Sequence, residues 1–321
     1  MPFKHNAARR HHTPRARYRV TNWPAYEAGL RRRGGLTSWV DEAALAGWRA
    51  PRRSTPGGQP RSSGLAVELA LALRPVSHLA LRQAEGFARS VSHLLGLALP
   101  VPGHAALSRR GRAFAGRRPR VQPGGGPLRL VLDGTGLELL GQGGRCAAKH
   151  GRLRRRWLKL HLGVDAATGE IAAHVLADGG DAAPVPALLR QCEGSLASVA
   201  ADGACGRGPV CQAAAARQPG PPPEVGVPPR ADAVPGTPEP DQQTPRDRRI
   251  RLMANRGRIG WQRAAGSGRR DHAETTMGRY KHLIGPKLRA RSRSAQLGEA
   301  ALAVQVLNRM IRDAKPVSVR R

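Results

Sequence analysis

The sequence predicts a mixed α/β (α+β) fold preceded by an all-α region. In the first third of the chain, apolar residues recur at three- and four-residue spacing, which is the period of an amphipathic helix. After residue 127, short apolar runs alternate with turn residues and helical patterns. The stretch RRPRVQPGGGP at 117–127 separates the two regions, and its Pro and Gly content is typical of a linker. We therefore expect a boundary between domains near residue 120.

The first region, 23–120, is expected to consist of helices joined by loops rich in Pro, Gly and Ser. Leu65, Leu69 and Leu73 share one helix face, and Pro75 should kink or end that helix. The segment TSWVDEAALAGW opens with a Thr-Ser capping signal. Further helices are expected at 25–33, 81–95 and 104–115.

Basic residues dominate the composition. The 321 residues include 54 Lys and Arg against 22 Asp and Glu, which gives a formal net charge of +32. Such an excess indicates a polyanionic partner, most simply nucleic acid, although a GC-rich genome would also raise the Arg content. The expected helix at 104–115 carries Arg109, Arg110 and Arg112. A helix, a short turn and an Arg-rich helix outline a helix-turn-helix DNA-binding region; a plain helical bundle with a solvated basic face is the alternative. Residues 1–22 are expected to form a flexible basic arm.

Several classes of protein are disfavoured. The four cysteines show no CxxC pair, so neither a zinc site nor a disulfide framework is expected. The basic N-terminus lacks a following apolar segment, and no stretch approaches about 18 uninterrupted apolar residues. We expect a soluble, cytoplasmic protein with no membrane partner.

The second region, 121–321, is expected to contain a meander of three strands followed by helix, strand, helix and strand. The segment RWLKLHLGVDAATGEIAAHVLAD predicts a β-hairpin with Gly169 in its turn. Residues 231–260 are rich in Pro, Asp and Arg and are expected to be a loop-like insertion before two final helices. The other strands are expected at 128–132, 195–202 and 223–230.

The carboxylate of Asp133 directly follows the apolar run LRLVL. A D-x-D-G-T phosphatase motif is excluded because Val131 occupies the position of the nucleophile. The remaining chemistry is two-metal phosphodiester cleavage, in which carboxylates hold hard divalent cations. A second aspartate, Asp202, ends the apolar run SLASVAAD. The two strand-end carboxylates are therefore candidate metal ligands.

A third carboxylate, Glu274, lies in the predicted helix RRDHAETTMGRYK. Arg270 and Lys281 precede and follow it by about one and two helical turns, so all three share one side of the helix. An exposed ion-pair ladder is the simpler explanation of this stripe by itself. Together with the two aspartates and the net charge, it favours a carboxylate for metal beside two cations for phosphate.

These residues carry a resemblance to a family. The pattern R-x3-E-x6-K resembles the C-terminal signature of bacterial insertion-sequence DDE transposases, of insertion-sequence families four and five. The segments NWPAYEAGLRRRG, LRQAEGFARS, LVLDGTGLEL, RRWLKLHLGVDAATGEI, ADGA and HAETTMGRYK resemble the family-five pattern in the same order, over about residues 18–315.

The resemblance implies a ribonuclease H-like catalytic domain that binds terminal inverted repeats and target DNA, cleaves the DNA and transfers the strand. It implies Asp133, Asp202 and Glu274 as a triad holding two Mg²⁺ ions, with Mn²⁺ as a substitute. Arg270 and Lys281 would contact phosphate. A homodimer on double-stranded DNA, associated with a bacterial nucleoid, is implied as well.

Several positions depart from the family pattern. Gly134 follows the first aspartate, where serine is usual, and aromatic or acidic residues are replaced at other motif positions. We expect such a copy to fold less stably, and the alternative function is a degenerate, catalytically impaired protein that only binds or blocks element ends. An RNA-binding protein is less favoured because Trp, Tyr and Phe number only five, three and three. The other departures are Gly144, Arg145, Cys205, Gly206, Cys211 and Ser267.

Overall fold

The described part of the chain forms two compact units. One unit holds the described residues up to Trp39 together with those from Met310 onward, and the other spans Val40–Arg309. The expected domain boundaries near residues 22 and 120 stay a prediction. The computed structural model describes residues 17–35, 39–121, 126–140, 157–205, 208–217, 223–229, 233–236, 244–264 and 271–320.

In the smaller unit, the two ends of the chain pair with each other. Strand β1 (Tyr18–Val20) runs antiparallel to β8 (Ser318–Arg320). The Asn22 side chain accepts the Val317 N–H at 2.7 Å, at the start of helix α1 (Trp23–Gly34). The prediction of a flexible arm over residues 1–22 is therefore wrong for residues 18–22, because their backbone finds a partner strand; residues 1–16 lie outside the described part.

The larger unit begins with helices whose ends follow local capping rules. Helix α2 (Glu42–Ala46) is capped by Asp41, whose carboxylate accepts the Ala44 N–H at 2.8 Å; the predicted Thr-Ser capping pair lies outside the described residues. Helix α3 (Gly64–Val76) ends one residue after Pro75, as predicted. Helix α4 spans Leu81–Leu94, helix α5 His104–Gly111, and a 3₁₀ turn, η3, Arg112–Phe114.

A carboxylate from α4 caps α5. Glu85 accepts both the backbone N–H of His104, at 2.7 Å, and its ring Nδ1, at 2.8 Å. These hydrogen bonds, with that from Arg89, lower the pKa of Glu85 to about 2. The contact compensates for Gly103, which has no side chain to cap the helix. No single described helix is long and apolar enough to span a membrane; α3 and α4 meet the length and composition test only as a pair bent by 111°.

A mixed sheet forms the centre of the larger unit. Its strands are β2 (Leu128–Leu139), β3 (Trp157–Asp165), β4 (Ile171–Ala177), β5 (Leu196–Ala200) and β6 (Glu224–Gly226), in the order β4-β3-β2-β5-β6. Strand β3 is antiparallel to both of its neighbours, β2 and β4. Strand β5 is parallel to β2, and β6 is parallel to β5. The short strand β7 (Lys287–Leu288) also pairs with β2.

The predicted hairpin between β3 and β4 is confirmed. Gly169 has a φ of +77°, a left-handed conformation that favours glycine. The Asp165 carboxylate is buried and accepts hydrogen bonds from the backbone of Ala167 and from Thr168. This carboxylate is thus used within the turn.

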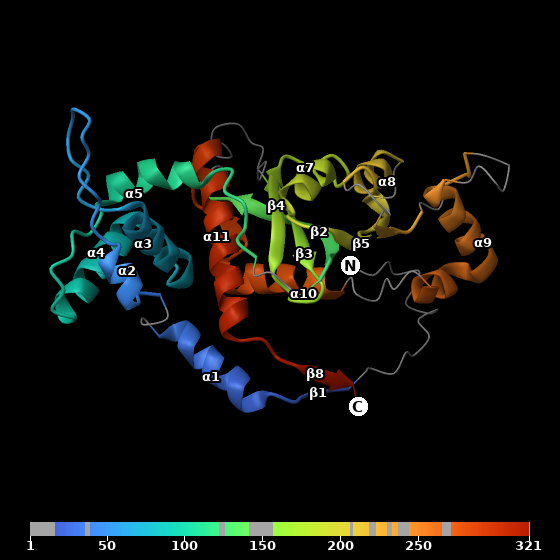
Figure 1. Cartoon of the computed structure of the whole chain (residues 1–321), viewed down its shortest axis with the longest axis horizontal. Helices are drawn as coiled ribbons and strands as arrows, with labels where there is room; N and C mark the ends of the chain where they lie inside the picture. Colours follow the sequence, from blue (N-terminus) through green and yellow to red (C-terminus); the bar gives the residue numbers. More distant parts are fainter. Residues whose placement is uncertain are drawn as a thin grey trace, which may run out of the picture. The chain divides into compact units, whose positions relative to one another are not determined.

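Helices cover both faces of the sheet (Figure 1). Helices α7 (Val185–Gln191) and α8 (Gly208–Ala215) pack on one face, where Leu130, Leu132 and Val199 form a continuous apolar cluster with them. Helix α10 (Asp271–Arg279) contacts β2 and β3. Its buried residues are not part of the apolar cluster under α7 and α8, so we infer that it covers the other face of the sheet. It continues into a π-helical turn, η7 (Tyr280–Ile284), and the long helix α11 (Arg293–Asp313) follows.

Two expectations for this region are wrong. Within the predicted insertion, residues 245–260 belong to helix α9 (Pro245–Ala264), which is interrupted at Gly257, where φ is +65°. Strand β2 also continues for seven residues past Leu132, so Asp133 lies within a strand and not at its end. Pairing with the longer β3 maintains this extension beyond the end of β5.

Candidate active site

The sheet places Asp133 and Asp202 side by side. The parallel register pairs Leu130 with Val199 and Val131 with Ala200, so two further residues along each strand align Asp133 with Asp202. Neighbouring strands lie about 4.8 Å apart. Since β5 ends at Ala200, Asp202 stands just beyond a strand end while Asp133 remains within β2.

Side-chain alternation sets the direction of Asp133. Leu132 belongs to the apolar cluster under α7 and α8, so Asp133, the next residue of β2, is directed to the opposite face, whereas Asp202 lies beyond the end of β5. That face is the one that α10 contacts, and α10 carries Glu274. The tertiary structure therefore brings the helix of the third predicted carboxylate to the side of the sheet toward which Asp133 is directed.

Both aspartates also border a small hollow of about 10 Å³ at the end of β5. One oxygen of Asp133 accepts the N–H of Gly134 at 2.8 Å, and one oxygen of Asp202 accepts the N–H of Cys205 at 3.3 Å. These bonds orient the carboxylates from their own backbone. The rest of the lining comes from Leu132, Gly134, His161, Asp181, Val185, Leu188 and Cys205.

The hollow is electrostatically negative. Burial, together with the charges of Asp202, Asp181 and Asp133, raises the pKa of the Cys205 thiol to about 12. The thiol is therefore protonated at neutral pH, and it donates to the Asp181 carbonyl at a sulfur–oxygen distance of 3.5 Å. Three carboxylates acting on one thiol show that negative charge converges at this point.

The sequence analysis did not predict a polar cluster of Lys159, His161 and Asp181 beside the two aspartates. Asp181 forms an ion pair with Lys159 and lies 3.8 Å from Nδ1 of His161. Lys159 and His161 alternate with leucines along β3, and this period-two pattern was the available signal. Burial lowers the pKa of His161 despite the opposing effect of Asp181, so its ring is neutral at physiological pH.

Glycine at position 134 allows this cluster to approach the strand. A Cβ atom there would lie 2.9 Å from Nδ1 of His161 and 2.9 Å from Cε of Lys159. The usual serine would therefore collide with the polar cluster. Gly134 is thus matched to its surroundings in this chain.

Glu274 occupies the first turn of α10 and is exposed, next to the buried stripe of Ala273 and Met277. It is not among the residues that line the hollow. Lys281 is exposed at the start of the π-helical turn. Arg270 lies outside the described residues.

The three predicted DNA-contacting arginines differ in their surroundings. Arg109 and Arg112 are exposed, whereas Arg110 is half-buried and donates to the backbone oxygen of Ser62 at 2.9 Å. Arg110 therefore has a structural contact within the helical region.

Of the motif departures, only Cys205 and Gly134 have described side-chain surroundings. Cys205 is 5% exposed. The adjoining hollow of about 10 Å³ is too small for a tyrosine ring, so a tyrosine at 205 would need its neighbours to move. The side chains of Gly144, Arg145, Gly206, Cys211 and Ser267 fall outside the described part.

The carboxylate oxygens of Asp133 and Asp202 are the kind of ligand that a hard divalent cation prefers. Asp133 and Asp202 offer oxygen ligands from adjacent strands, as Mg²⁺ and Mn²⁺ require. Among the described residues, no group of three or more His, Cys, Asp or Glu side chains is already positioned to hold a metal ion. The two aspartates thus fit as part of a ligand set, and a third carboxylate would have to come closer.

Comparison with known proteins places the chain in a class. Two family models, both described as a transposase DDE domain, match residues 31–142 and 124–309. Because the second covers more than half of the sequence, the chain belongs to the DDE transposase family. Its function is accordingly in DNA transposition, and enzymes of this family generally use divalent metal ions. The chain is also similar to a cryo-EM structure of the piggyBac transposase synaptic complex with hairpin DNA, at 10% identity and a TM-score of 0.37, over 92% of this chain and 77% of that one.

Proposed function

We propose that this chain is a Mg²⁺-dependent transposase that cleaves DNA at the terminal inverted repeats of an insertion sequence and joins the freed ends to target DNA. The observation that carries the proposal is that Asp133 and Asp202 border one hollow next to strand β2, which the helix that bears Glu274 also contacts. A ribonuclease H-like catalytic fold is supported by the strand order, with the first aspartate on the central strand, the second after the fourth strand and the glutamate on a late helix.

Each group of residues has a proposed role. Asp133, Asp202 and Glu274 would hold two divalent cations, Mg²⁺ or Mn²⁺. When bound, such cations activate an attacking oxygen and stabilise the leaving oxygen in phosphodiester cleavage. The chain's residues would fix the position of the scissile phosphate, with Lys281 and Arg270 as its cationic contacts.

The helical region would bind the double-stranded DNA itself. Arg109 projects from α5, which Glu85 fixes against α4, and Arg112 from the turn η3 that follows, so α4 and α5 with η3 are the proposed DNA-reading unit. Arg110 would contribute mainly by holding α5 against Ser62. A homodimer that joins two element ends, of insertion-sequence family five or four and in a bacterial nucleoid, completes the proposal.

The test is cleavage of a labelled duplex carrying the flanking terminal repeat, with Mg²⁺, with Mn²⁺ and with EDTA. Asp133→Asn, Asp202→Asn and Glu274→Gln should each abolish metal-dependent nicking at the repeat boundary while leaving DNA binding intact. Glu138→Gln is the matched control. Glu138 lies five residues after Asp133 on the same strand, so its side chain projects from the opposite face of the sheet. It forms an ion pair with Lys287 at 3.2 Å.

A protein that binds the repeats without cutting them is the second candidate, favoured by the position of Glu274 outside the hollow. It predicts repeat-specific binding in either metal with no nicking by the wild type. That result would reject the catalytic proposal for this copy.

A further inference from the structure

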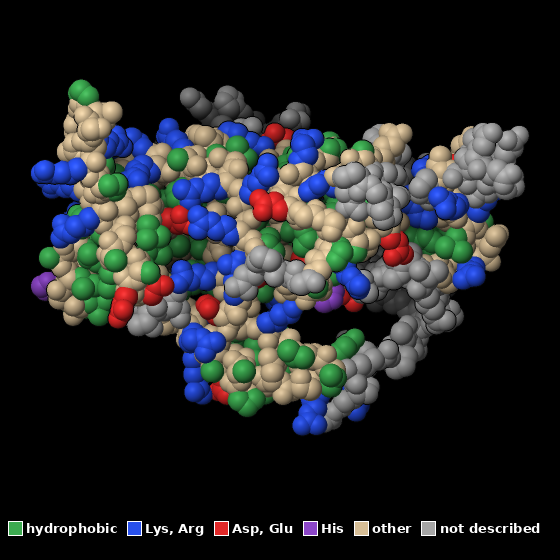
Figure 2. Space-filling model, in the orientation of Figure 1, with side chains coloured by type: hydrophobic (Ala, Val, Ile, Leu, Met, Phe, Trp, Pro, Cys, Tyr) green, Lys and Arg blue, Asp and Glu red, His purple; other side chains and the backbone are tan. Residues whose placement is uncertain are grey.

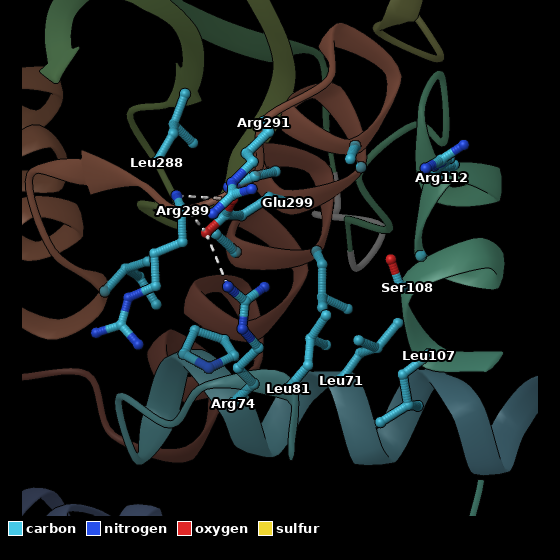
Figure 3. Close-up of a pocket in the computed structure, with 18 of the residues that line it drawn as sticks. Leu71, Arg74, Leu81, Leu107, Ser108, Arg112, Leu288, Arg289, Arg291 and Glu299 are labelled. Atoms are coloured by element: carbon cyan, nitrogen blue, oxygen red, sulfur yellow. Dashed lines mark hydrogen bonds and ion pairs between the residues drawn. The ribbon is translucent and has the colours of Figure 1, made fainter. Parts of the chain in front are cut away.

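A cavity of about 440 Å³ lies in the larger unit (Figure 3). Its walls come from α3, α5 and η3 on one side and from η7, β7 and α11 on the other. The volume falls within the range of about 300–1,000 Å³ that is usual for small-molecule sites. Asp133, Asp202 and Glu274 do not line it, so it is separate from the candidate active site.

The inner part of the cavity is apolar. Leu71, Leu107, Leu288 and Leu302 line it from four different elements and are themselves buried. Gly298 of α11 approaches α5 so closely that a Cβ atom there would lie 2.2 Å from the backbone oxygen of Gly111. The contact fixes the two walls against each other and provides a preformed apolar floor.

Cationic side chains surround this floor, and Glu299 is the single acidic residue among the described lining. Glu299 is fully engaged, because it accepts the N–H groups of Arg289 and Ala290 and lies 3.7 Å from the guanidinium of Arg74. The cationic lining residues are Arg74, Arg112, Lys287, Arg289 and Arg291.

Two of these cations remain available for a ligand. Arg289 donates to the backbone oxygen of His78, and Lys287 pairs with Glu138. The guanidinium groups of Arg112 and Arg291 are exposed, and within the described part of the chain neither has a hydrogen-bond or ion-pair partner. They come from different walls, η3 and the loop before α11 (Figure 3).

We propose that this cavity binds a nucleoside phosphate, with the base against the leucines and the phosphate at the cationic lining that includes Arg112 and Arg291. A planar base suits an apolar hollow, and guanidinium groups bind phosphate through two parallel hydrogen bonds. The cationic lining disfavours a cationic or neutral apolar ligand. The nucleotide is either free or an unstacked residue of a DNA strand; only the second source rests on the proposed function.

The probe is 5′-deoxyadenosine monophosphate, titrated by calorimetry into the full-length protein in EDTA and without DNA. Deoxyadenosine and inorganic phosphate are titrated in parallel. Arg112→Gln and Arg291→Gln should each weaken binding by about tenfold, since each removes a charged phosphate contact. Ser108→Trp should abolish binding, because this exposed lining residue would project an indole into the cavity without altering the buried floor. Arg190→Gln, which changes an exposed arginine of α7 outside the lining, is the control.

The possible results distinguish a free nucleotide from a nucleotide of DNA, and failure of this proposal from failure of the catalytic proposal. Binding of the monophosphate that is tighter than that of either fragment, and that is lost in the cavity variants but not in the control, supports the proposal. Displacement by a single-stranded oligonucleotide then assigns the nucleotide to DNA, and no displacement assigns it to a free nucleotide. Equal binding of inorganic phosphate, or equal effects of Arg190→Gln and Arg112→Gln, would overturn it. Since no cleavage is measured, failure of the catalytic proposal leaves this result unaffected.

Discussion

At the scale of single residues, Gly134 sets how closely the polar cluster approaches the paired aspartates. A side chain there would meet the ring of His161, which is almost fully buried and cannot turn away. Lys159 can move only by leaving Asp181. The position is therefore constrained by its neighbours, even though the family pattern has serine there.

We expect Gly134→Ser to reduce the free energy of unfolding by about 1–3 kcal/mol, the usual cost of overpacking. Urea denaturation of the two proteins measures it. Gly86→Ala is the control, because no atom lies within 4 Å of its Cβ position and the change should be neutral or stabilising in helix α4. Equal stability of wild type and Gly134→Ser would show that the cluster adjusts freely.

The buried residue His174 predicts a pH dependence. Burial lowers its pKa to about 4, and its Nδ1 atom has no partner among the described residues. Because the folded-state pKa lies below the ordinary 6.5, the unfolded chain takes up a proton first as the pH falls. The stability is complete above pH 6.5 and is lost between pH 6.5 and about 4.

Between pH 7 and pH 5, the wild type should lose about 2 kcal/mol of unfolding free energy more than His174→Leu. The comparison uses the pH slope of each protein, so a general loss of stability in the variant does not affect it. Identical slopes would mean that the imidazole is protonated as readily in the folded chain as in the unfolded one.

At the scale of elements, the contact between α5 and α11 joins the helices that precede the sheet to the long helix that follows it. Its closeness depends on Gly298, whose Cβ position is blocked by backbone rather than by a movable side chain. Leu107 and Leu302 pack near this contact and are buried. Any enlargement of residue 298 therefore has to separate two helices.

Gly298→Ala should accordingly destabilise the protein by about 1–3 kcal/mol or more, despite the higher helix propensity of alanine. Thermal and urea unfolding measure the change. Gly278→Ala in α10 is the matched control, since nothing lies within 4 Å of that Cβ position. If both variants gain stability, the helices are not in the close contact seen here.

At the scale of the whole molecule, positive charge is the dominant property. Figure 2 shows Lys and Arg side chains spread over the visible face, with few acidic ones between them. The formal charge of +32 predicts DNA binding that weakens steeply with salt, because each phosphate contact releases a counterion.

Arg109→Gln and Arg112→Gln should each reduce the slope of log K against log salt by about one for duplex DNA. Arg110→Gln should instead lower stability, because its guanidinium holds the Ser62 backbone. Filter binding at several salt concentrations, with urea unfolding in parallel, distinguishes the two effects. A slope change with Arg110→Gln and none with Arg109→Gln would contradict this division.

The sequence alone determined the elements whose patterns are local. Helices α3 and α4, the hairpin of β3 and β4 and the candidate residues Asp133, Asp202 and Glu274 all followed from spacing, turn residues or family motifs. Such signals succeed because helix and strand periods and turn preferences depend on residues close along the chain.

Only the tertiary structure decided what depends on distant partners. The extension of β2 past Asp133 needs β3, the strand at 18–20 needs the other end of the chain, and the role of Asp181 needs Lys159. The register that aligns Asp133 with Asp202 is likewise a pairing of strands more than 60 residues apart in sequence. Sequence patterns show which face of an element is apolar, but packing between elements selects which polar groups meet.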